Sequence, residues 1–229
     1  MKNPVAKKVL INGANGKMGQ AMIRLIEQCP ELGLTVAATR TAGQDITADF
    51  DIIIDFSTPQ GAEEAFALAK HYQKPFLTGT TNLPESFLTQ LKQEKNFPVF
   101  FAPNVSLSVY FFTQLAQQAA AMYEGYSLHL HEIHHVHKKD APSGTAKKIA
   151  AALNFPAGQV TYERIGETVG THEVKFSSPF DEISLTHKAL NRDLFAKSAL
   201  EIAAWLVTCD KGFYTMKDYA KFKLEERKK

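Results

Sequence analysis

A strand, a glycine-rich turn and a helix at the start of the chain constrain its fold more than any other feature. The apolar run Lys8 to Asn12 predicts a short buried strand, and apolar residues at helical spacing from Gln20 to Gln28 predict a helix. Between them lies a turn, Gly13 to Gly19, with glycine at every third position. Glycine there permits a positive φ and lets backbone N–H groups approach a pyrophosphate, so the turn indicates a dinucleotide site. Because the spacing is G-x-x-G-x-x-G rather than G-x-G-x-x-G, a plain β–α turn remains the alternative.

The strand and helix pattern divides the chain into two parts. Up to about residue 105 the sequence predicts further strands over 34–39, 51–55, 75–78 and 98–102, and helices over 59–71 and 84–95. This alternation is typical of an α/β fold with a mainly parallel sheet and helices on both faces. The later pattern predicts helices over 106–123, 143–153 and 192–208, a strand over 126–138, and two or three strands over 160–187. We therefore expect a second, smaller α+β domain with an open mixed sheet.

Composition argues against several classes of protein. The 229 residues have a net charge of only +2, without the clustered basic surface that nucleic-acid binding needs. The two cysteines, Cys29 and Cys209, have no metal-ligand spacing and fit a reducing compartment. No apolar run suggests a membrane span and no signal peptide is visible in Met1 to Lys8, so we expect a cytoplasmic protein. The basic stretch Lys221 to Lys229 is expected to be a solvated helix end or a frayed terminus.

Loops that follow predicted strands are candidates for one cofactor cleft, because an α/β sheet binds ligands at the carboxyl ends of its strands. Besides the glycine turn, they are Gly79-Thr80-Thr81 and Ala102-Pro103-Asn104-Val105. Where an acidic residue after the second strand would bind the ribose hydroxyls, the sequence has Thr39 and Arg40. Arg40 can pair with a 2′-phosphate, so we predict that NADPH is used at least as well as NADH. A solvated surface arginine is the alternative.

Five of the eight histidines lie between residues 129 and 137. On a strand, the four odd-numbered ones share a face and His134 points the other way. A metal site is one interpretation, but metal ligands usually come from more than one element, and surface histidines are another. We favour acid–base chemistry by His134 and Lys138, which have the same strand parity. An extended strand would separate them by roughly 13 Å, so either the chain turns near Val136 or they contact different ends of a substrate.

The residues after Lys138 predict an anion site. Asp140-Ala-Pro142 indicates a turn, and Ser143 is a good N-cap for a helix that begins with Gly144 and Thr145. The backbone N–H groups of such a helix start suit a carboxylate or a phosphate, although a plain helix cap is the alternative. An ammonium, imidazoles and a helix N-terminus within a dozen residues fit a small dianionic substrate that undergoes a proton transfer.

The motif that spans these residues resembles the signature of a known family. The run Glu132-x-His134-His135-x-x-Lys138-x-Asp140-Ala-Pro-Ser-Gly-Thr-Ala146 is similar to that of the 4-hydroxy-tetrahydrodipicolinate reductases (dihydrodipicolinate reductases) of bacterial lysine biosynthesis. The glycine turn also resembles the cofactor loop of that family. Further matching motifs extend over most of the chain: Asp55-Phe-Ser-Thr58, Gly79-Thr-Thr81, Ala102-Pro-Asn104, Gly170-Thr-His-Glu-Val174, Thr186-His-Lys-Ala189 with Arg192-Asp193, and Gly212-Phe-Tyr-Thr-Met216.

The resemblance implies a fold and a reaction. It implies a Rossmann-like cofactor domain over residues 1–105 and 191–229, and a substrate-binding domain over 106–190 that builds a homotetramer. It implies an NAD(P)H-dependent oxidoreductase of lysine and diaminopimelate biosynthesis, which transfers hydride to C4 of the substrate ring and yields tetrahydrodipicolinate. His134 matches a proton donor or acceptor and Lys138 the catalytic proton donor. We expect no metal.

The resemblance also implies binding residues. His135, Gly144 and Thr145 match contacts to a substrate carboxylate, and the residues themselves add Lys138 and Ser143. Arg192 matches an arginine near the hinge between the domains. The implied cofactor contacts, with Thr39 added from its position, are Gly13, Ala14, Asn15, Gly16, Lys17, Met18, Thr39, Arg40, Gly79, Thr80, Thr81, Ala102, Pro103, Asn104 and Val105.

Three positions depart from the family pattern. Thr39 stands where an acid is common, Val105 replaces an aromatic residue near the nicotinamide, and Ser108 replaces a glycine. We expect these to change cofactor affinity and not to abolish activity. Two other functions remain open. A different Rossmann-type oxidoreductase of a small dicarboxylate would differ in the second domain, and a non-catalytic nucleotide sensor would not need His134 and Lys138 together.

Overall fold

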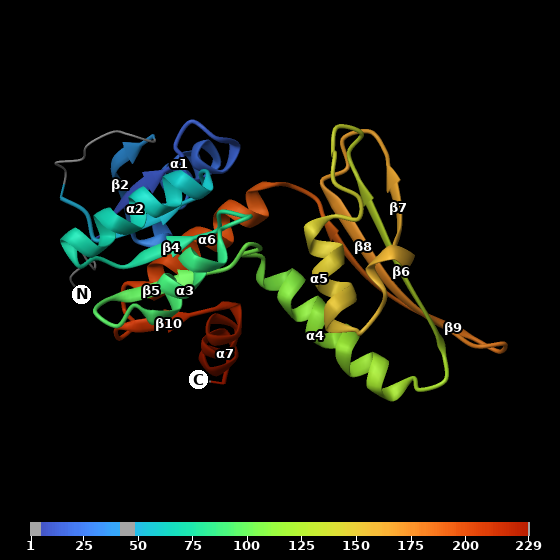
Figure 1. Cartoon of the computed structure of the whole chain (residues 1–229). Coiled ribbons are helices and arrows are strands. Elements are labelled where there is room, and N and C mark those ends of the chain that lie inside the picture. The colour runs from blue at the N-terminus through green and yellow to red at the C-terminus, as the bar shows by residue number, and fades with distance from the viewer. Residues whose placement is uncertain (1–5, 42–48, 229) are drawn as a thin grey trace. The chain divides into compact units, whose positions relative to one another are not determined.

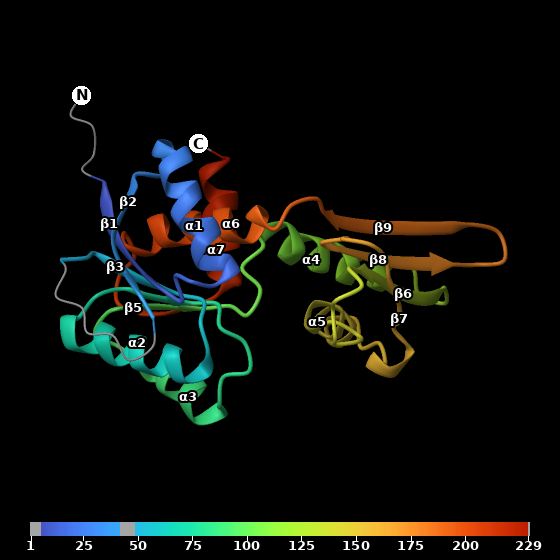
Figure 2. The ribbon, with the colours of Figure 1, turned by 90° about the horizontal axis from the view of Figure 1, so that it is seen from above.

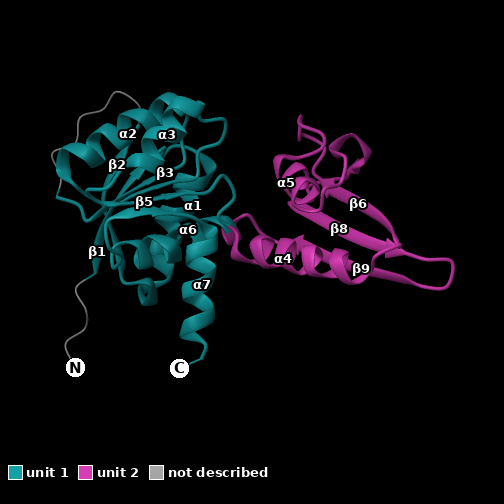
Figure 3. Ribbon diagram, turned by 60° about the horizontal axis from the view of Figure 1, so that its bottom comes forward, with its two compact units in different colours: residues 1–105, 195–229 teal, residues 106–194 magenta. Residues whose placement is uncertain are grey.

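The computed structural model describes residues 6–41 and 49–228, which form two compact units. Unit 1 consists of Met1–Val105 and Phe195–Lys229, and unit 2 of Ser106–Leu194 (Figure 3). The chain thus leaves the first unit once and returns to it at Phe195, where the sequence suggested residue 191. The first five residues and Lys229, on which the expectations about a signal peptide and the basic tail partly rest, lie outside the described residues.

Unit 1 is built on a sheet of parallel strands in the order β10-β5-β4-β3-β1-β2. The predicted parallel sheet is therefore confirmed. The chain runs from β1 outward to β2 and then back to β3 on the other side of β1, and this reversal is where α/β sheets bind ligands. The strands are β1 (Lys7–Asn12), β2 (Leu34–Arg40), β3 (Ile52–Asp55), β4 (Phe76–Thr78), β5 (Pro98–Phe101) and β10 (Gly212–Tyr214).

Helices cover both faces of this sheet (Figures 1 and 2). On one face lie α1 (Lys17–Gln28), α6 (Asp193–Leu206) and α7 (Met216–Glu226), and on the other α2 (Pro59–Tyr72) and α3 (Glu85–Gln93); a short 3₁₀ helix spans Pro30–Leu32. No helix in the described part of the chain has the length and apolar character of a membrane span. The predicted start of α1 at Gln20 is wrong, because Gly16 is its N-cap. Lys17 and Met18 therefore belong to its first turn.

Two aromatic clusters pack against the sheet of unit 1. On the side of α2 and α3, Phe66 contacts Phe76 and Phe87 within a core whose strand β3 is completely buried. On the side of α6 and α7, Trp205 packs among aromatic rings of the sheet and of α7. Trp205 is the chain's only tryptophan. These clusters hold the strands whose carboxyl ends carry the candidate cofactor loops.

Unit 2 has a mixed sheet in the order β7-β6-β8-β9, as predicted. The strands are β6 (Ser127–His134), β7 (Thr161–Arg164), β8 (Gly170–Ser177) and β9 (Glu182–Ala189), and only the β6–β7 pair is parallel among these pairings. The helices α4 (Leu107–Met122) and α5 (Gly144–Ala152) pack on one face, where Phe112 and Ile149 join Leu130 and Val174 in a single core. A 3₁₀ helix spans Ala157–Gln159.

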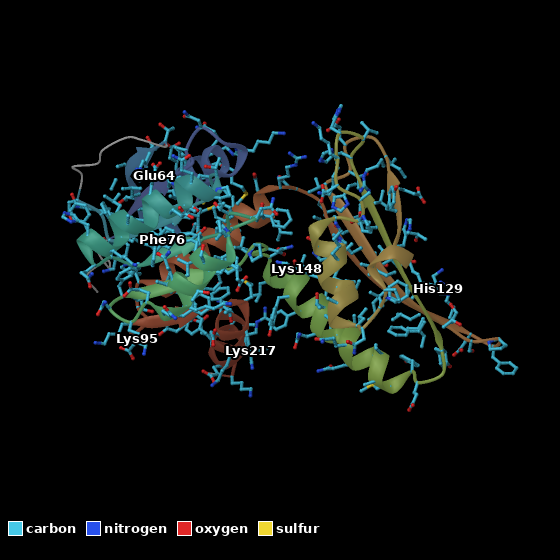
Figure 4. All side chains as sticks on the ribbon, viewed as in Figure 1. Glu64, Phe76, Lys95, His129, Lys148 and Lys217 are labelled. Atoms are coloured by element: carbon cyan, nitrogen blue, oxygen red, sulfur yellow. The ribbon has the colours of Figure 1, made fainter. Side chains whose placement is uncertain are left out.

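The predicted strand over 126–138 runs four residues too far at its carboxyl end, because β6 ends at His134. A turn follows, in which the backbone N–H of Lys138 donates to the carbonyl of His135 at 3.1 Å. Of the two alternatives that the spacing of His134 and Lys138 left open, a turn near Val136 is thus present. Alternating burial along β6 places His134 on the face covered by α4 and α5, while His129 is exposed (Figure 4).

Candidate active site

The glycine turn at the start of unit 1 fits an anion-binding helix N-terminus. Gly13 has φ 82°, and a Cβ there would lie 2.3 Å from the carbonyl oxygen of Phe56. A residue with a side chain would therefore disturb both the glycine turn and the loop after β3. Gly16 caps α1 without a side-chain hydrogen bond, and the first turn of the helix has no acidic residue. The local structure therefore suits a pyrophosphate, whose charge the helix dipole stabilises.

Arg40, at the end of β2, is held inside unit 1. Its side chain is buried, and its guanidinium donates to Oδ1 of Asn12 at 2.9 Å and to Oε2 of Glu64 at 2.8 Å. The alternative of a solvated surface arginine is therefore wrong. Glu64 projects from α2 (Figure 4) and neutralises the charge that was expected to select a 2′-phosphate. A phosphate that binds Arg40 has to compete with this carboxylate.

Asp55, at the end of β3, organises the neighbouring loops. Its carboxylate is fully buried and accepts hydrogen bonds at 2.7 Å from Asn12, Thr78 and Thr80, and a fourth from Ser57. The hydroxyl of Thr80 also accepts from the backbone N–H of Ser57 at 2.9 Å, which ties the loop after β4 to the loop after β3. This central role of Asp55 was missed, although a carboxylate directly after three isoleucines was a visible signal.

The other predicted cofactor loops also follow strands of this sheet. A Cβ at Gly79 would lie 2.1 Å from the ring of Phe56, so glycine allows the two loops to approach. After β5, the backbone N–H of Ala102 donates to Thr78, and both Ala102 and Val105 are buried. The glycine turn, the loop after β4 and the loop after β5 therefore stand at the carboxyl ends of strands of one parallel sheet, in which β3 separates β1 from β4.

In unit 2, Glu132 lies beneath two histidines. Its side chain has no solvent exposure, and one oxygen, Oε1, accepts from the backbone N–H of Ser143 at 2.8 Å and from Arg164 at 3.2 Å. The other, Oε2, lies 3.2 Å from Nδ1 of His134 and 3.7 Å from Nε2 of His172. Among the described residues, neither Oε2 of Glu132 nor Nδ1 of His134 has a partner with hydrogen-bond geometry, so their contact is electrostatic. Oε1 of this buried carboxylate is therefore fixed by hydrogen bonds, and Oε2 faces two imidazoles.

Sheet register brings these groups together. Glu132 and His134 are two residues apart on β6 and so share a face, and His172 stands opposite Glu132 on β8. Gly170 begins β8, and a Cβ there would lie 3.0 Å from Nε2 of His134. The strand thus has no side chain where the imidazole needs room. His172 was not predicted as a site residue, although alternation with Val174 and Phe176 places it on the apolar face.

Burial and charge set the protonation of this cluster. Burial would raise the pKa of Glu132, but the adjacent imidazole of His134 and the hydrogen bond from the backbone N–H of Ser143 lower it to about 2. Burial and the neighbouring His134 lower the pKa of His172 to about 4. At neutral pH the carboxylate is therefore ionised and His172 is neutral.

Lys138 lies beside a carboxylate of the chain itself. Its ammonium contacts Asp140 at 2.7 Å. Burial would raise the pKa of Asp140, but Lys138 and the backbone at Gly144 lower it. The ammonium and the start of α5 thus already stabilise a carboxylate, which is the chemistry that the sequence predicted for this segment.

The remaining predicted substrate residues differ in their hydrogen bonds within the protein. Ser143 is buried, and its hydroxyl accepts from the backbone N–H of Ala146 at 3.1 Å, so the predicted N-cap is confirmed, while contact of Ser143 with the substrate stays a prediction. Gly144 and Thr145 form the first turn of α5. Nδ1 of His135 is buried without a hydrogen-bond partner among the described residues, and burial and Arg192 lower the pKa of its imidazole.

The other histidines of the segment are separate from this cluster. His131 lies within 2.8 Å of the hydroxyl of Thr161, and His137 is largely exposed. Ligand atoms of Glu132, His134 and His172 do lie within 4.8 Å of one another, a spacing that suits a metal ion. Because Arg164 already places a cation on Glu132, we assign no metal there, and the expected absence of a metal stays a prediction.

Comparison with known proteins identifies the family. Residues 7–105 match the family model for the N-terminus of dihydrodipicolinate reductase, and residues 108–219 match the model for its C-terminus. The chain belongs to the dihydrodipicolinate reductase family. It is 36% identical over 231 residues to the 4-hydroxy-tetrahydrodipicolinate reductase of Xanthomonas euvesicatoria pv. vesicatoria (strain 85-10), covering 93% of this chain and 97% of that one. The enzyme of the same name from Stenotrophomonas maltophilia (strain R551-3) is 35% identical, covering 94% and 98%.

A solved structure has the same fold. Dipicolinate-bound dihydrodipicolinate reductase from Paenisporosarcina sp. TG-14 matches with a TM-score of 0.72 at 21% identity, over 92% of this chain and 97% of that one. The Rossmann-like fold of unit 1 and the smaller mixed-sheet unit are thus those of this family. Family membership confirms the prediction of an NAD(P)H-dependent oxidoreductase.

Proposed function

We propose that this dihydrodipicolinate reductase homologue reduces 4-hydroxy-tetrahydrodipicolinate to tetrahydrodipicolinate in lysine and diaminopimelate biosynthesis. The observation that carries the proposal is the anion-stabilising ammonium of Lys138, four residues after the buried His134, in a chain 36% identical to an enzyme named for this reaction. The reaction consumes NAD(P)H and a proton and releases water. A homotetramer and a cytoplasmic location remain predictions.

The substrate is a dicarboxylate in this proposal. The Lys138 ammonium and the first turn of α5 stabilise the carboxylate of Asp140, and a substrate carboxylate at the same place would meet the same charge and dipole. The related structure from Paenisporosarcina was solved with dipicolinate bound, which is a planar dicarboxylate. We assign this contact to His135, Lys138, Gly144 and Thr145, and give Ser143 the role of holding the helix start.

Unit 1 holds the cofactor in this proposal. NADPH or NADH supplies the hydride, which adds at C4 of the substrate ring. The glycine turn, Gly13 to Met18, would hold the pyrophosphate, because its backbone suits an anion. Thr39 and Arg40 would face the adenosine ribose, with Glu64 competing for the arginine. The loops Gly79 to Thr81 and Ala102 to Val105 would contact the rest of the cofactor. Thr80 would do so chiefly through its backbone, because its hydroxyl donates to Asp55.

Proton transfer falls to His134 and Lys138. His134 is nearly buried, and an imidazole there can give or take a proton without exchange with bulk water. Lys138 carries an ammonium that neutralises a carboxylate and can donate a proton. A different oxidoreductase of a small dicarboxylate would use the same two groups, so the substrate has to be tested directly.

The decisive experiment follows NADPH oxidation with freshly generated substrate. We expect turnover in the wild type and a fall in kcat of about 100-fold or more in His134→Ala and in Lys138→Ala, because general acid–base groups contribute at least that much. His129→Ala and Lys147→Ala, at exposed positions of β6 and α5, are the matched controls and should retain kcat. Calorimetric titration should find NADPH affinity unchanged in all four variants.

Two outcomes would contradict the proposal. A wild type that binds NADPH and leaves the substrate unreduced would refute the reaction, and would favour another oxidoreductase or a nucleotide sensor. Full turnover in either His134→Ala or Lys138→Ala would refute the role of that residue alone.

A further inference from the structure

The two oxygens of Glu132 have different surroundings. Oε1 is held by the backbone of Ser143 and by Arg164, which fixes the carboxylate within unit 2. Oε2 is buried, accepts no hydrogen bond from the residues that the structure describes, and lies 3.2 Å from Nδ1 of His134. Leaving a carboxylate oxygen buried and unsatisfied is costly, so its position next to an imidazole that also lacks a partner calls for an explanation.

We propose that Glu132 is a positioning residue for His134, directing Nδ1–H of the imidazole toward Oε2 and leaving Nε2 for proton transfer. The inference rests on the proposed role of His134. A small rotation of the ring would convert the present 3.2 Å contact into a charge-assisted hydrogen bond. A carboxylate at Nδ1 selects the tautomer and stabilises the imidazolium, because it favours the charged form of its neighbour.

The groups around the pair leave this carboxylate available to His134. Arg164 on β7 approaches the other oxygen, Oε1, and so anchors Glu132 without occupying Oε2. His172 on β8 is the second imidazole near Oε2, but at 3.7 Å it is farther away than His134 and is neutral at pH 7. On the side of α5 the carboxylate meets the neutral Ser143. Lys138, in the turn after β6, is paired with Asp140.

The face of the ring away from Glu132 is equally constrained. Nε2 of His134 lies over Gly170, where a Cβ would stand at 3.0 Å. The imidazole therefore lies between a carboxylate at one nitrogen and bare backbone near the other. This arrangement holds the ring in place, and in the described part of the chain no side chain makes a hydrogen bond or ion pair with Nε2, as expected for a group that exchanges a proton with a ligand.

Nuclear magnetic resonance of the ligand-free protein tests the inference independently of turnover. In histidine-labelled protein, the ¹⁵N shifts of His134, assigned by their absence in His134→Gln, report which nitrogen carries the proton. We expect the Nδ1–H tautomer in the wild type, and a His134 pKa that is at least about one unit lower in Glu132→Gln, a tenfold change in proton affinity. Glu124→Gln, which removes an exposed charge from the same unit, should leave both properties unchanged.

Kinetics give a second readout. If the imidazolium is the proton donor, activity is lost as pH rises through its pKa, so this limb of the kcat/KM profile should move to lower pH by about one unit in Glu132→Gln. Glu132→Asp should recover part of the wild-type profile, because it restores the charge at a greater distance. A purely structural role for Glu132 would change KM or stability and leave the profile in place.

The outcomes separate this inference from the proposed reaction. An Nε2–H tautomer in the wild type, or an unchanged His134 pKa in Glu132→Gln, would overturn it whatever the protein catalyses. A wild type without reductase activity but with the expected tautomer and shift would refute the reaction alone. If Glu132→Gln does not fold, the wild-type tautomer and the Glu132→Asp titration still decide the question.

Discussion

Each unit contains a fully buried carboxylate at a strand's carboxyl-terminal half, and the two are satisfied in different ways. Asp55 in unit 1 accepts four side-chain hydrogen bonds that use both of its oxygens. Glu132 in unit 2 has, within residues 6–41 and 49–228, two donors on one oxygen and none on the other. The first network is closed, and the second keeps an unused acceptor facing His134 and His172.

The difference corresponds to two kinds of task. A closed network ties the loops after β3 and β4 together and fixes the shape of the cofactor side before any ligand arrives. An open network is costly to bury but retains a charge that can respond to the protonation of its neighbour. Buried carboxylates at the ends of strands therefore do not identify a catalytic group by themselves, and the number of donors on each oxygen distinguishes the two cases.

The largest expected effect is on the free energy of unfolding when each carboxylate is replaced by an amide of the same shape, and it differs between Asp55 and Glu132. Asp55→Asn places an NH₂ group among four donors, and we expect it to lower the free energy of unfolding of unit 1 by about 3–4 kcal/mol. Glu132→Gln places its NH₂ toward His134 and the neutral His172, and Arg164 retains its hydrogen bonds to the carbonyl oxygens of Glu163 and Asp140. We therefore expect a loss of about 1–2 kcal/mol in unit 2.

Native-state amide hydrogen exchange, followed by mass spectrometry, measures these two losses unit by unit. Each variant is the control for the other, because both replace a buried carboxylate by an amide of the same shape. Equal losses in the two variants would mean that Glu132 is as fully engaged as Asp55, and the comparison would fail.

A smaller effect depends on pH. The pKa of His172 is lowered from 6.5 to about 4, so the unfolded chain takes up the proton first and stability falls as pH drops through this window. We expect a loss of up to about 1.4 kcal/mol per pH unit. Glu132, lowered from 4.5 to about 2, stabilises the fold above pH 4.5 and loses this contribution only below it.

Urea midpoints between pH 4 and 7, recorded by circular dichroism, measure the dependence on His172. His172→Gln should flatten the curve between pH 4 and 6.5, and His71→Gln, at an exposed position of α2, should leave it unchanged. A wild-type slope that persists in His172→Gln would show that other groups cause it.

The smallest effect concerns the ion pair between Arg40 and Glu64, which joins the Asp55 network through Asn12. Glu64→Gln removes the charge that Arg40 now pairs with, so we expect the Kd for NADPH to fall about fivefold, or about 1 kcal/mol, with the Kd for NADH changed less than twofold. Isothermal titration calorimetry with both cofactors measures this, and Glu63→Gln, exposed on the same helix, is the control. A similar change for both cofactors would argue against a role of Arg40 at the 2′-phosphate.

The spacing of apolar residues predicted most of the strands and helices and, in unit 2, the face of β6 on which His134 lies. The isoleucine run of β3 and the alternation in β6 fixed strands and faces, because burial has a regular spacing along the chain. The three-residue strand β10 was missed, since so short a segment has no periodicity. The partner of Arg40 was beyond reach for another reason: Glu64 lies 24 residues away, and only the packing of α2 on the sheet brings it near. His172 could have been found from its parity with Val174.

The packing of Trp205 among the rings of α7 and the sheet has a practical consequence. It is the only indole in the chain, and it lies in unit 1, whereas unit 2 has tyrosines but no tryptophan. Its fluorescence emission therefore reports the unfolding of unit 1 and does not report the unfolding of unit 2. Trp205 emission compared with circular dichroism would show whether unit 1 and unit 2 lose their structure together or in sequence, without any label.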